Sequence, residues 1–122
     1  MEEQIRTHLV ADPALSAASV DWGARPQGAE YPGIVLTVAS DTGGQTYDGP
    51  DGFSVSRIQV DVYALSYGEA RTLARAIRAR LDGYKSGDVR GTFRVGERDS
   101  RESGDAERPF RVSQDFEVHW RV

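Results

Sequence analysis

The stretch from Ser54 to Gly83, SVSRIQVDVYALSYGEARTLARAIRARLDG, carries the two clearest secondary-structure signals of the 122-residue chain. Apolar and polar residues alternate up to Ala64, which predicts a strand with one buried face. Ser66 and Glu69 then have the spacing of a capping box, in which the serine hydroxyl accepts a hydrogen bond from the first helical turn. Apolar residues follow at helical spacing: Ala70, Leu73, Ala74, Ile77, Leu81 and Tyr84. Gly83 suits the left-handed conformation that ends many helices, so we expect an amphipathic helix directly after the strand.

Weaker signals precede this stretch. Residues Glu2 to Ala11 read as a short amphipathic helix, which Asp12 and Pro13 end. A short strand is predicted between Ser19 and Arg25, and the apolar run GIVLTVAS from Gly33 to Ser40 predicts another. The polar segment Asp41–Gly52 holds four glycines and one proline, which is typical of a long loop or of the tip of a long hairpin.

Two more strands are predicted after the helix. In the first, Val89, Gly91, Phe93 and Val95 are expected on the inward face. The polar run 97–109 is expected to be a loop. The last strand starts at Phe110, and its outward set is charged or polar: Arg111, Ser113, Asp115, Glu117, His119 and Arg121. Its inward set is apolar and broken only by Gln114: Phe110, Val112, Phe116, Val118, Trp120 and Val122.

This order of elements predicts one α+β domain over residues 1–122. Strands occur in runs with helices between the runs, so we expect a single mainly antiparallel sheet with two helices packed on one face. No stretch approaches the roughly 20 apolar residues that cross a bilayer, and the acidic start lacks the features of a signal peptide. We therefore expect a soluble protein with no membrane partner, made in the cytoplasm.

Composition excludes several kinds of chemistry. The chain has no cysteine, which removes disulfides, thiol nucleophiles and thiolate metal sites. Its formal net charge of −4 argues against a protein that binds nucleic acid by neutralising phosphates. Fourteen arginines stand against the single Lys85, which reflects either genome composition or bidentate ion pairs at interfaces.

No catalytic, cofactor-binding or metal-binding residue is predicted. His8 and His119 are far apart and show no metal-ligand spacing, so we expect both on the surface. The segment Asp48–Gly52 lacks the alternating carboxylates of a calcium loop and reads as consecutive turns. No nucleophile elbow is present, and Gly43–Gly44 does not open a phosphate-binding helix. We therefore expect a binding or assembly unit rather than an enzyme.

Arginines concentrate on the predicted helix, at Arg71, Arg75, Arg78 and Arg80. They form a solvated face, an intersubunit salt-bridge surface or, as a third reading, a nucleic-acid surface. The two polar segments 41–53 and 97–109 are the other candidate contacts, with Tyr47 and Phe53 as aromatic anchors. The candidate interaction residues are Tyr47, Asp48, Asp51, Phe53, Arg71, Arg75, Arg78, Arg101 and Glu102.

Six segments together resemble one known family. They are YPGIVL (31–36), DGPDG (48–52), RIQVDVYA (57–64), YGEARTLA (67–74), LDG (81–83) and RVSQDF (111–116). In this order they are similar to the small tail completion, or tail terminator, proteins of long-tailed bacteriophages, prophages and gene transfer agents.

The resemblance implies a structural virion protein of α+β fold that forms a ring, typically a hexamer, without catalytic residues or cofactors. The ring would cap the head-proximal end of the tail tube, end tube polymerisation and mediate head–tail joining. Its implied partners are copies of itself, the tail tube protein and the head–tail connector protein, with DNA only passing through the lumen. Another neck component, such as a head-completion or connector protein, is the alternative. A small enzyme or nucleic-acid-binding regulator that uses the Arg71, Arg75 and Arg78 face is a more distant one.

Overall fold

A computed structural model shows two α-helices and five strands in the residues that it describes. It describes residues 1–15, 18–24, 31–46, 49–101 and 109–121, and side chains in these ranges outside 42–53 and 100–101. The elements in chain order are α1 (Glu2–Val10), a 3-10 turn η1 (Pro13–Leu15), β1 (Ser19–Trp22), β2 (Gly33–Thr46), β3 (Gly49–Ala64), α2 (Tyr67–Leu81), β4 (Val89–Arg101) and β5 (Phe110–Arg121).

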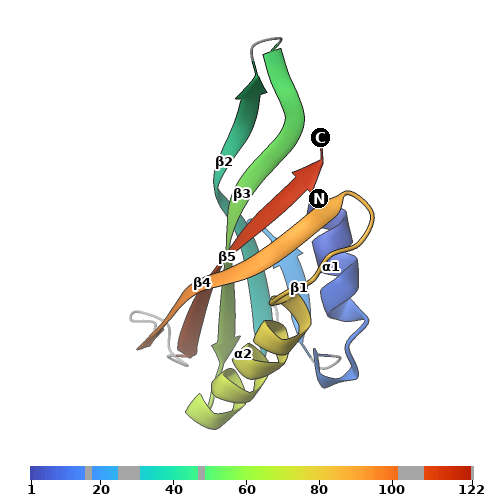
Figure 1. The fold of residues 1–122 in the computed structure, drawn as a ribbon. Helices are drawn as coiled ribbons and strands as arrows, with labels where there is room; N and C mark the ends of the chain where they lie inside the picture. Colours follow the sequence, from blue (N-terminus) through green and yellow to red (C-terminus); the bar gives the residue numbers. More distant parts are fainter. Residues whose placement is uncertain (16–17, 25–30, 47–48, 102–108, 122) are drawn as a thin grey trace.

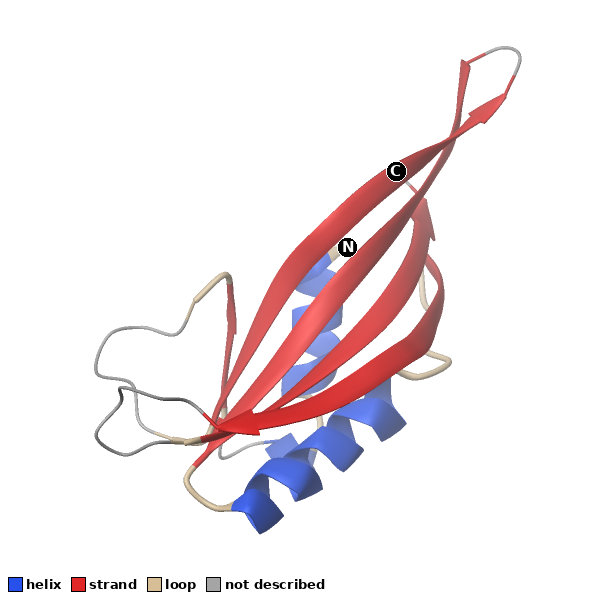
Figure 2. Cartoon of the chain, turned by 90° about the vertical axis from the view of Figure 1, so that its left-hand side faces the viewer, coloured by secondary structure: helices blue, strands red, loops and turns tan. Residues whose placement is uncertain are grey.

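The strands form one sheet in the order β1-β2-β3-β5-β4. The short strand β1 is parallel to β2, and the other three pairs are antiparallel. Both helices lie on the same face of the sheet, α1 beside β1 and α2 across β3, β5 and β4 (Figures 1 and 2). The prediction of an α+β fold, with a mainly antiparallel sheet covered by two helices on one face, is confirmed.

The core lies between this sheet and the helices. Alternate residues of β3 and β5 point toward α2, as the sequence pattern predicts, and side chains such as Ile58, Val60 and Phe116 are fully buried. Ile5 of α1 and Ile77 of α2 meet them from the helix layer. Each such side chain contributes about 1.5–3 kcal/mol through its removal from water, so this layer stabilises the fold.

Helix α2 begins and ends where the sequence predicts. The Ser66 side chain accepts a hydrogen bond from the Glu69 backbone N–H at 3.1 Å, which caps the first turn. The predicted inward positions from Ala70 to Leu81 are buried, and Tyr84 is half-buried. Gly83, with φ of +82°, leads the chain out of the helix in the left-handed region that glycine adopts without strain.

The β2–β3 hairpin projects beyond the rest of the sheet (Figure 1). β3 pairs with β5 only from Phe53 onward, whereas its pairing with β2 continues to Thr46 opposite Gly49. The outer part is therefore a two-stranded arm. Of the two structures left open for Asp41–Gly52, the long hairpin is the correct one.

Strand β4 departs from the sequence prediction in two ways. It continues to Arg101, so residues 97–101 are strand rather than loop. Its inward pattern is also wrong after Gly91: Phe93 and Val95 are 52% and 47% exposed, while Thr92 is fully buried. The physical reason is a pair of register shifts against β5, one between Val89 and Gly91 and one between Arg94 and Gly96, and each reverses the face that the following side chains occupy.

Candidate assembly surfaces

No helix covers the face of the sheet opposite α1 and α2 in the described part of the chain (Figure 2), and the side chains that register places on this face are polar or charged for the most part. Cross-strand register places Thr37, Gln59, Asp61, Tyr63, Arg57, Arg111, Ser113, Asp115, Glu117 and His119 on it. We call it the open face. The outward set predicted for the last strand lies here as expected, although Ser113 is buried by its neighbours.

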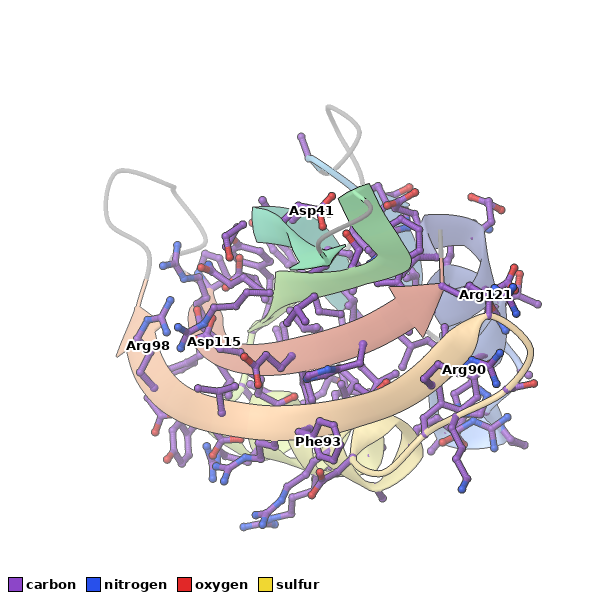
Figure 3. All side chains as sticks on the ribbon, turned by 45° about the horizontal axis from the view of Figure 1, so that its top comes forward. Asp41, Arg90, Phe93, Arg98, Asp115 and Arg121 are labelled. Carbon is purple, nitrogen blue, oxygen red and sulfur yellow. The ribbon has the colours of Figure 1, made fainter. Side chains whose placement is uncertain are left out.

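Hydrogen bonds organise one end of the open face. The buried carboxylate of Asp61 accepts hydrogen bonds from Ser113 and from Gln59, whose Nε2 lies 3.1 and 3.0 Å from the two carboxylate oxygens. Arg98 donates to Asp115 at 2.8 Å and to the Gln59 side-chain oxygen at 3.1 Å (Figure 3). Half-exposed pairs of this kind contribute less than about 1 kcal/mol each, but together they hold three strands' polar side chains in fixed positions.

A second polar cluster joins α2 to the end of β4. Arg71 contacts Glu97 at 2.9 Å and Asp99 at 3.0 Å. Tyr67 donates to Asp99 at 2.9 Å. The fully buried amide of Gln114 donates to Glu97 at 2.7 Å and to the Ala74 carbonyl at 2.8 Å. This cluster explains why the charged sequence after Glu97 forms a strand, because its acidic side chains find partners on the helix.

Electrostatics in this cluster follow from the same contacts. Burial alone raises the pKa of Glu97, but hydrogen bonds from Gln114 and Arg71 outweigh it and hold that pKa below its usual value. The hydrogen bond to Glu97 raises the pKa of Arg71. The hydrogen bond to Asp99 likewise raises the pKa of Tyr67. Arg71 therefore holds α2 to β4. A second molecule that binds Arg71 would compete with Glu97 and Asp99 for its guanidinium group.

The other helix arginines divide into two kinds. Arg80 donates to the His8 carbonyl at 3.0 Å, and the His8 ring stacks on Tyr84 with centroids 3.7 Å apart, so both residues tie α1 to α2. Arg75 and Arg78 are exposed and form no ion pair with any described residue. They line an open groove of about 330 Å³ with Ala79 and Asp82. Asp82 accepts from the Arg94 backbone at 3.2 Å, so the groove borders the outer edge of β4.

The remaining candidate residues do not gather at one place. Asp51 and Phe53 belong to β3 on the arm, and Arg101 ends β4 opposite Phe110, at the other end of the sheet. Tyr47, Asp48 and Glu102 lie outside the described residues. Sequence reasoning missed three exposed apolar side chains near the sheet edges, Val38, Phe93 and Val95, because apolar residues in strands were assigned to the core.

Within the described residues, no group of three or more His, Asp or Glu side chains has the arrangement of a metal site. His119, on the open face, lies edge-on to Phe93 with centroids 5.4 Å apart, and His8 is half-buried. Neither described helix is long and apolar enough to cross a membrane.

The fold and its surfaces define a class: a single-sheet α+β protein whose polar open face, projecting arm and exposed arginine groove suit contacts with other macromolecules. The sequence matches the family described as Tail completion protein gp17 over residues 3–120. The chain belongs to this family, whose members are structural proteins and not enzymes. This confirms the resemblance seen in the sequence.

The fold is also found in a solved particle. A chain from the virion of a native gene transfer agent particle superposes with a TM-score of 0.79 at 16% sequence identity. The match covers 97% of this chain and 92% of that one, so the two share the fold over nearly their whole lengths. No curated protein matches the chain.

Proposed function

We propose that this tail completion protein is a tail terminator, which forms a ring on the head-proximal end of the tail tube. The ring ends tube polymerisation and offers a surface to the connector of the head. The family match over residues 3–120 carries this proposal. The likeness of fold to a chain of a gene transfer agent virion supports a place in a phage or phage-like particle.

The surfaces suit such a role. The β2–β3 arm presents a strand pair that reaches past the sheet, with the candidate Asp51 on it and the candidate Phe53 where it meets β5. Tyr47 and Asp48, which stand between the two strands in the sequence, are candidates too. Arg101 is a candidate at the opposite end of the sheet, and Glu102, the next residue in the sequence, is another candidate. A ring has two faces, one toward the tube and one toward the head, and two contact regions at opposite ends of one subunit match that need. The net charge of −4 disfavours binding to DNA that passes through the lumen.

Loss of the gene tests the proposal. Particles assembled without the protein are expected to carry tubes of abnormal length or tails that fail to join heads. Tails of normal length joined to heads in its absence would reject the proposal.

A pull-down separates this role from that of another neck component. A terminator has to bind the end of the tube, so purified protein is mixed with assembled tubes and, separately, with the portal-side connector. Retention by tubes is the expected result, whereas retention by the connector alone would make the protein a head-completion or connector component.

A further inference from the structure

We infer that copies of this chain associate head to tail, with an acidic edge of one subunit against a basic edge of the next. The inference rests on the proposed ring and names the surfaces by which its subunits meet. Such a contact is heterologous, and a heterologous contact that closes on itself generates a ring.

Charge is segregated along the sequence. Residues 1–41 contain six acidic and two basic residues, a formal charge of −4, whereas residues 67–101 contain nine basic and five acidic residues, a formal charge of +4. The two remaining parts of the chain, 42–66 and 102–122, carry −2 each. The net charge of −4 therefore conceals two segments of opposite sign.

The strand order places the described strands of these two segments at opposite edges of the sheet, while their helices α1 and α2 lie side by side on one face. Residues 1–41 form α1, β1 and the first part of β2, and residues 67–101 form α2 and β4. In the strand order β1-β2-β3-β5-β4, β1 and β2 lie at one edge, with Glu2 of α1 beside Trp22 of β1, and β4 lies at the other edge. We call them the acidic edge and the basic edge. Each subunit thus offers surfaces of opposite sign in opposite directions, which is the complementarity that a head-to-tail contact needs.

Part of the acidic edge has no neighbouring strand in the described chain. β1 covers β2 only from Gly33 to Leu36, so nothing in the described chain pairs with the outer side of β2 from residue 37 to 41. Val38 is 39% exposed there. In β1, the Asp21 Oδ2 atom is buried without a hydrogen-bond partner among described residues. Asp41, farther along β2, is exposed and held by the hydroxyls of the Ser54 and Ser56 side chains (Figure 3).

The basic edge supplies matching groups. Arg75 and Arg78 line a groove together with Asp82, whose side chain is bound to β4. Arg90 is exposed on β4 itself (Figure 3). Phe93 and Val95 add exposed apolar area on β4, and the Phe93 ring lies against His119 of the open face. Two backbone groups of β4 are already occupied: the Thr92 carbonyl by Gly83, and the Arg94 N–H by Asp82. The basic edge therefore meets its neighbour mainly through side chains.

Strand direction agrees with this arrangement. β2 is antiparallel to β3, β3 to β5 and β5 to β4, so β2 and β4 run in opposite directions within a subunit. Placing β4 of one copy beside β2 of the next by rotation about a ring axis continues the antiparallel order from subunit to subunit.

Two charge-reversed variants test the contact: Arg75→Glu with Arg78→Glu, and Glu2→Arg with Asp41→Arg. All four side chains are exposed, so the variants are expected to fold, which thermal unfolding by circular dichroism checks. The assay is sedimentation velocity at about 50 mM NaCl, where surface charges are weakly screened. The wild-type chain is expected to form oligomers, and each variant alone is expected to associate about tenfold or more weakly.

Mixing the two variants is the decisive experiment. One variant has two acidic edges and the other has two basic edges, so an equimolar mixture is expected to regain the oligomer in alternating order. A chain that carries all four substitutions, with wild-type net charge, is expected to regain it as well. The matched control is Arg57→Glu with Arg121→Glu, which changes net charge as the arginine variant does, but on the central strands β3 and β5. The control is expected to associate like the wild type.

A wild-type chain that stays monomeric at low salt and about millimolar concentration would overturn the inference, as would oligomers that survive either reversal. Failure of the mixture to regain the oligomer would also overturn it, and so would loss of association in the control. These results leave the proposed function standing if tubes still bind the wild-type chain. Wild-type oligomers that obey the charge rule but ignore tubes would instead reject the proposed function and keep the interface.

Discussion

Replacing Glu97 by glutamine is expected to destabilise the fold through one contact that sequence reasoning did not foresee. Glu97 joins Arg71 of α2 to the buried Gln114 of β5, with contacts of 2.9 and 2.7 Å. Glutamine has nearly the same shape, so the change removes the charge and leaves the packing. The acceptor of two charge-assisted hydrogen bonds becomes a neutral amide.

The expected cost is about 2 kcal/mol of the free energy of unfolding. Hydrogen bonds to charged groups contribute roughly 1.5–3 kcal/mol each. Gln114 and Arg71 use different oxygens of Glu97, and glutamine keeps only one of these acceptors, so one hydrogen bond is lost and the other becomes a weaker, neutral one. The Glu97 side chain is only 15% exposed, so water restores little. For a domain of this size, the cost corresponds to a fall of about 6–8 °C in the melting temperature.

Calorimetry or circular dichroism at about pH 7 measures the loss, and an acid series tests its origin. The folded-state pKa of Glu97 is lower than its ordinary value of 4.5, so the charge stabilises the fold above pH 4.5. That stability is lost as the pH falls through the folded-state pKa. The melting temperatures of the wild-type chain and the variant are therefore expected to converge as the pH falls below 4.5.

Asp99→Asn is the matched control, because Asp99 contacts the same arginine at 3.0 Å with a side chain that is 43% exposed. Solvent screens that pair, so its loss is expected to cost less than about 1 kcal/mol. Equal losses in the two variants, or a Glu97→Gln variant that melts with the wild type at neutral pH, would refute the assignment of the stability to the buried link.

Three further changes test the local structure. Ser66→Ala removes the acceptor for the Glu69 N–H and is expected to cost about 1 kcal/mol, measured as a lower urea midpoint with an unchanged m-value. Phe116→Ala empties the centre of the core and is expected to cost about 3–5 kcal/mol, against which a variant that keeps wild-type stability would argue. Gly83→Ala forces a side chain to adopt a φ of +82° and is expected to cost about 1 kcal/mol. Gly68→Ala, in helical backbone with open space around it, is expected to leave the melting temperature unchanged or to raise it slightly.

The sequence predicts the parts of the fold whose side chains obey one local rule. Helix α2 has its cap at Ser66, its apolar stripe and its terminal Gly83, and the structure has all three. β3 and most of β5 alternate as expected because no bulge interrupts the register between them. Gln114 is the one polar residue in the inward set of β5. It still points into the core, where its amide donates hydrogen bonds to α2 and β4.

β4 is the element that sequence pattern could not give, for two physical reasons. Bulges at two places reverse the faces of its side chains, and a bulge leaves no reliable trace in hydrophobic alternation. Its second half is charged, so it looks like a loop, yet Glu97 and Asp99 pair with Arg71 of α2, which stands 28 residues before Asp99 in the sequence. Such pairing depends on tertiary structure, which local propensity does not contain.

Net charge, like local sequence pattern, gives only part of what is needed to predict function. A total of −4 argues against a phosphate-binding protein, but a total says nothing about where the charges lie. The strand order β1-β2-β3-β5-β4 converts a difference along the sequence into a difference between two edges, and that order depends on the long-range pairing of β5 between β3 and β4. Arginine rather than lysine at the basic edge then has a structural use, because its planar donors suit carboxylates on a facing surface.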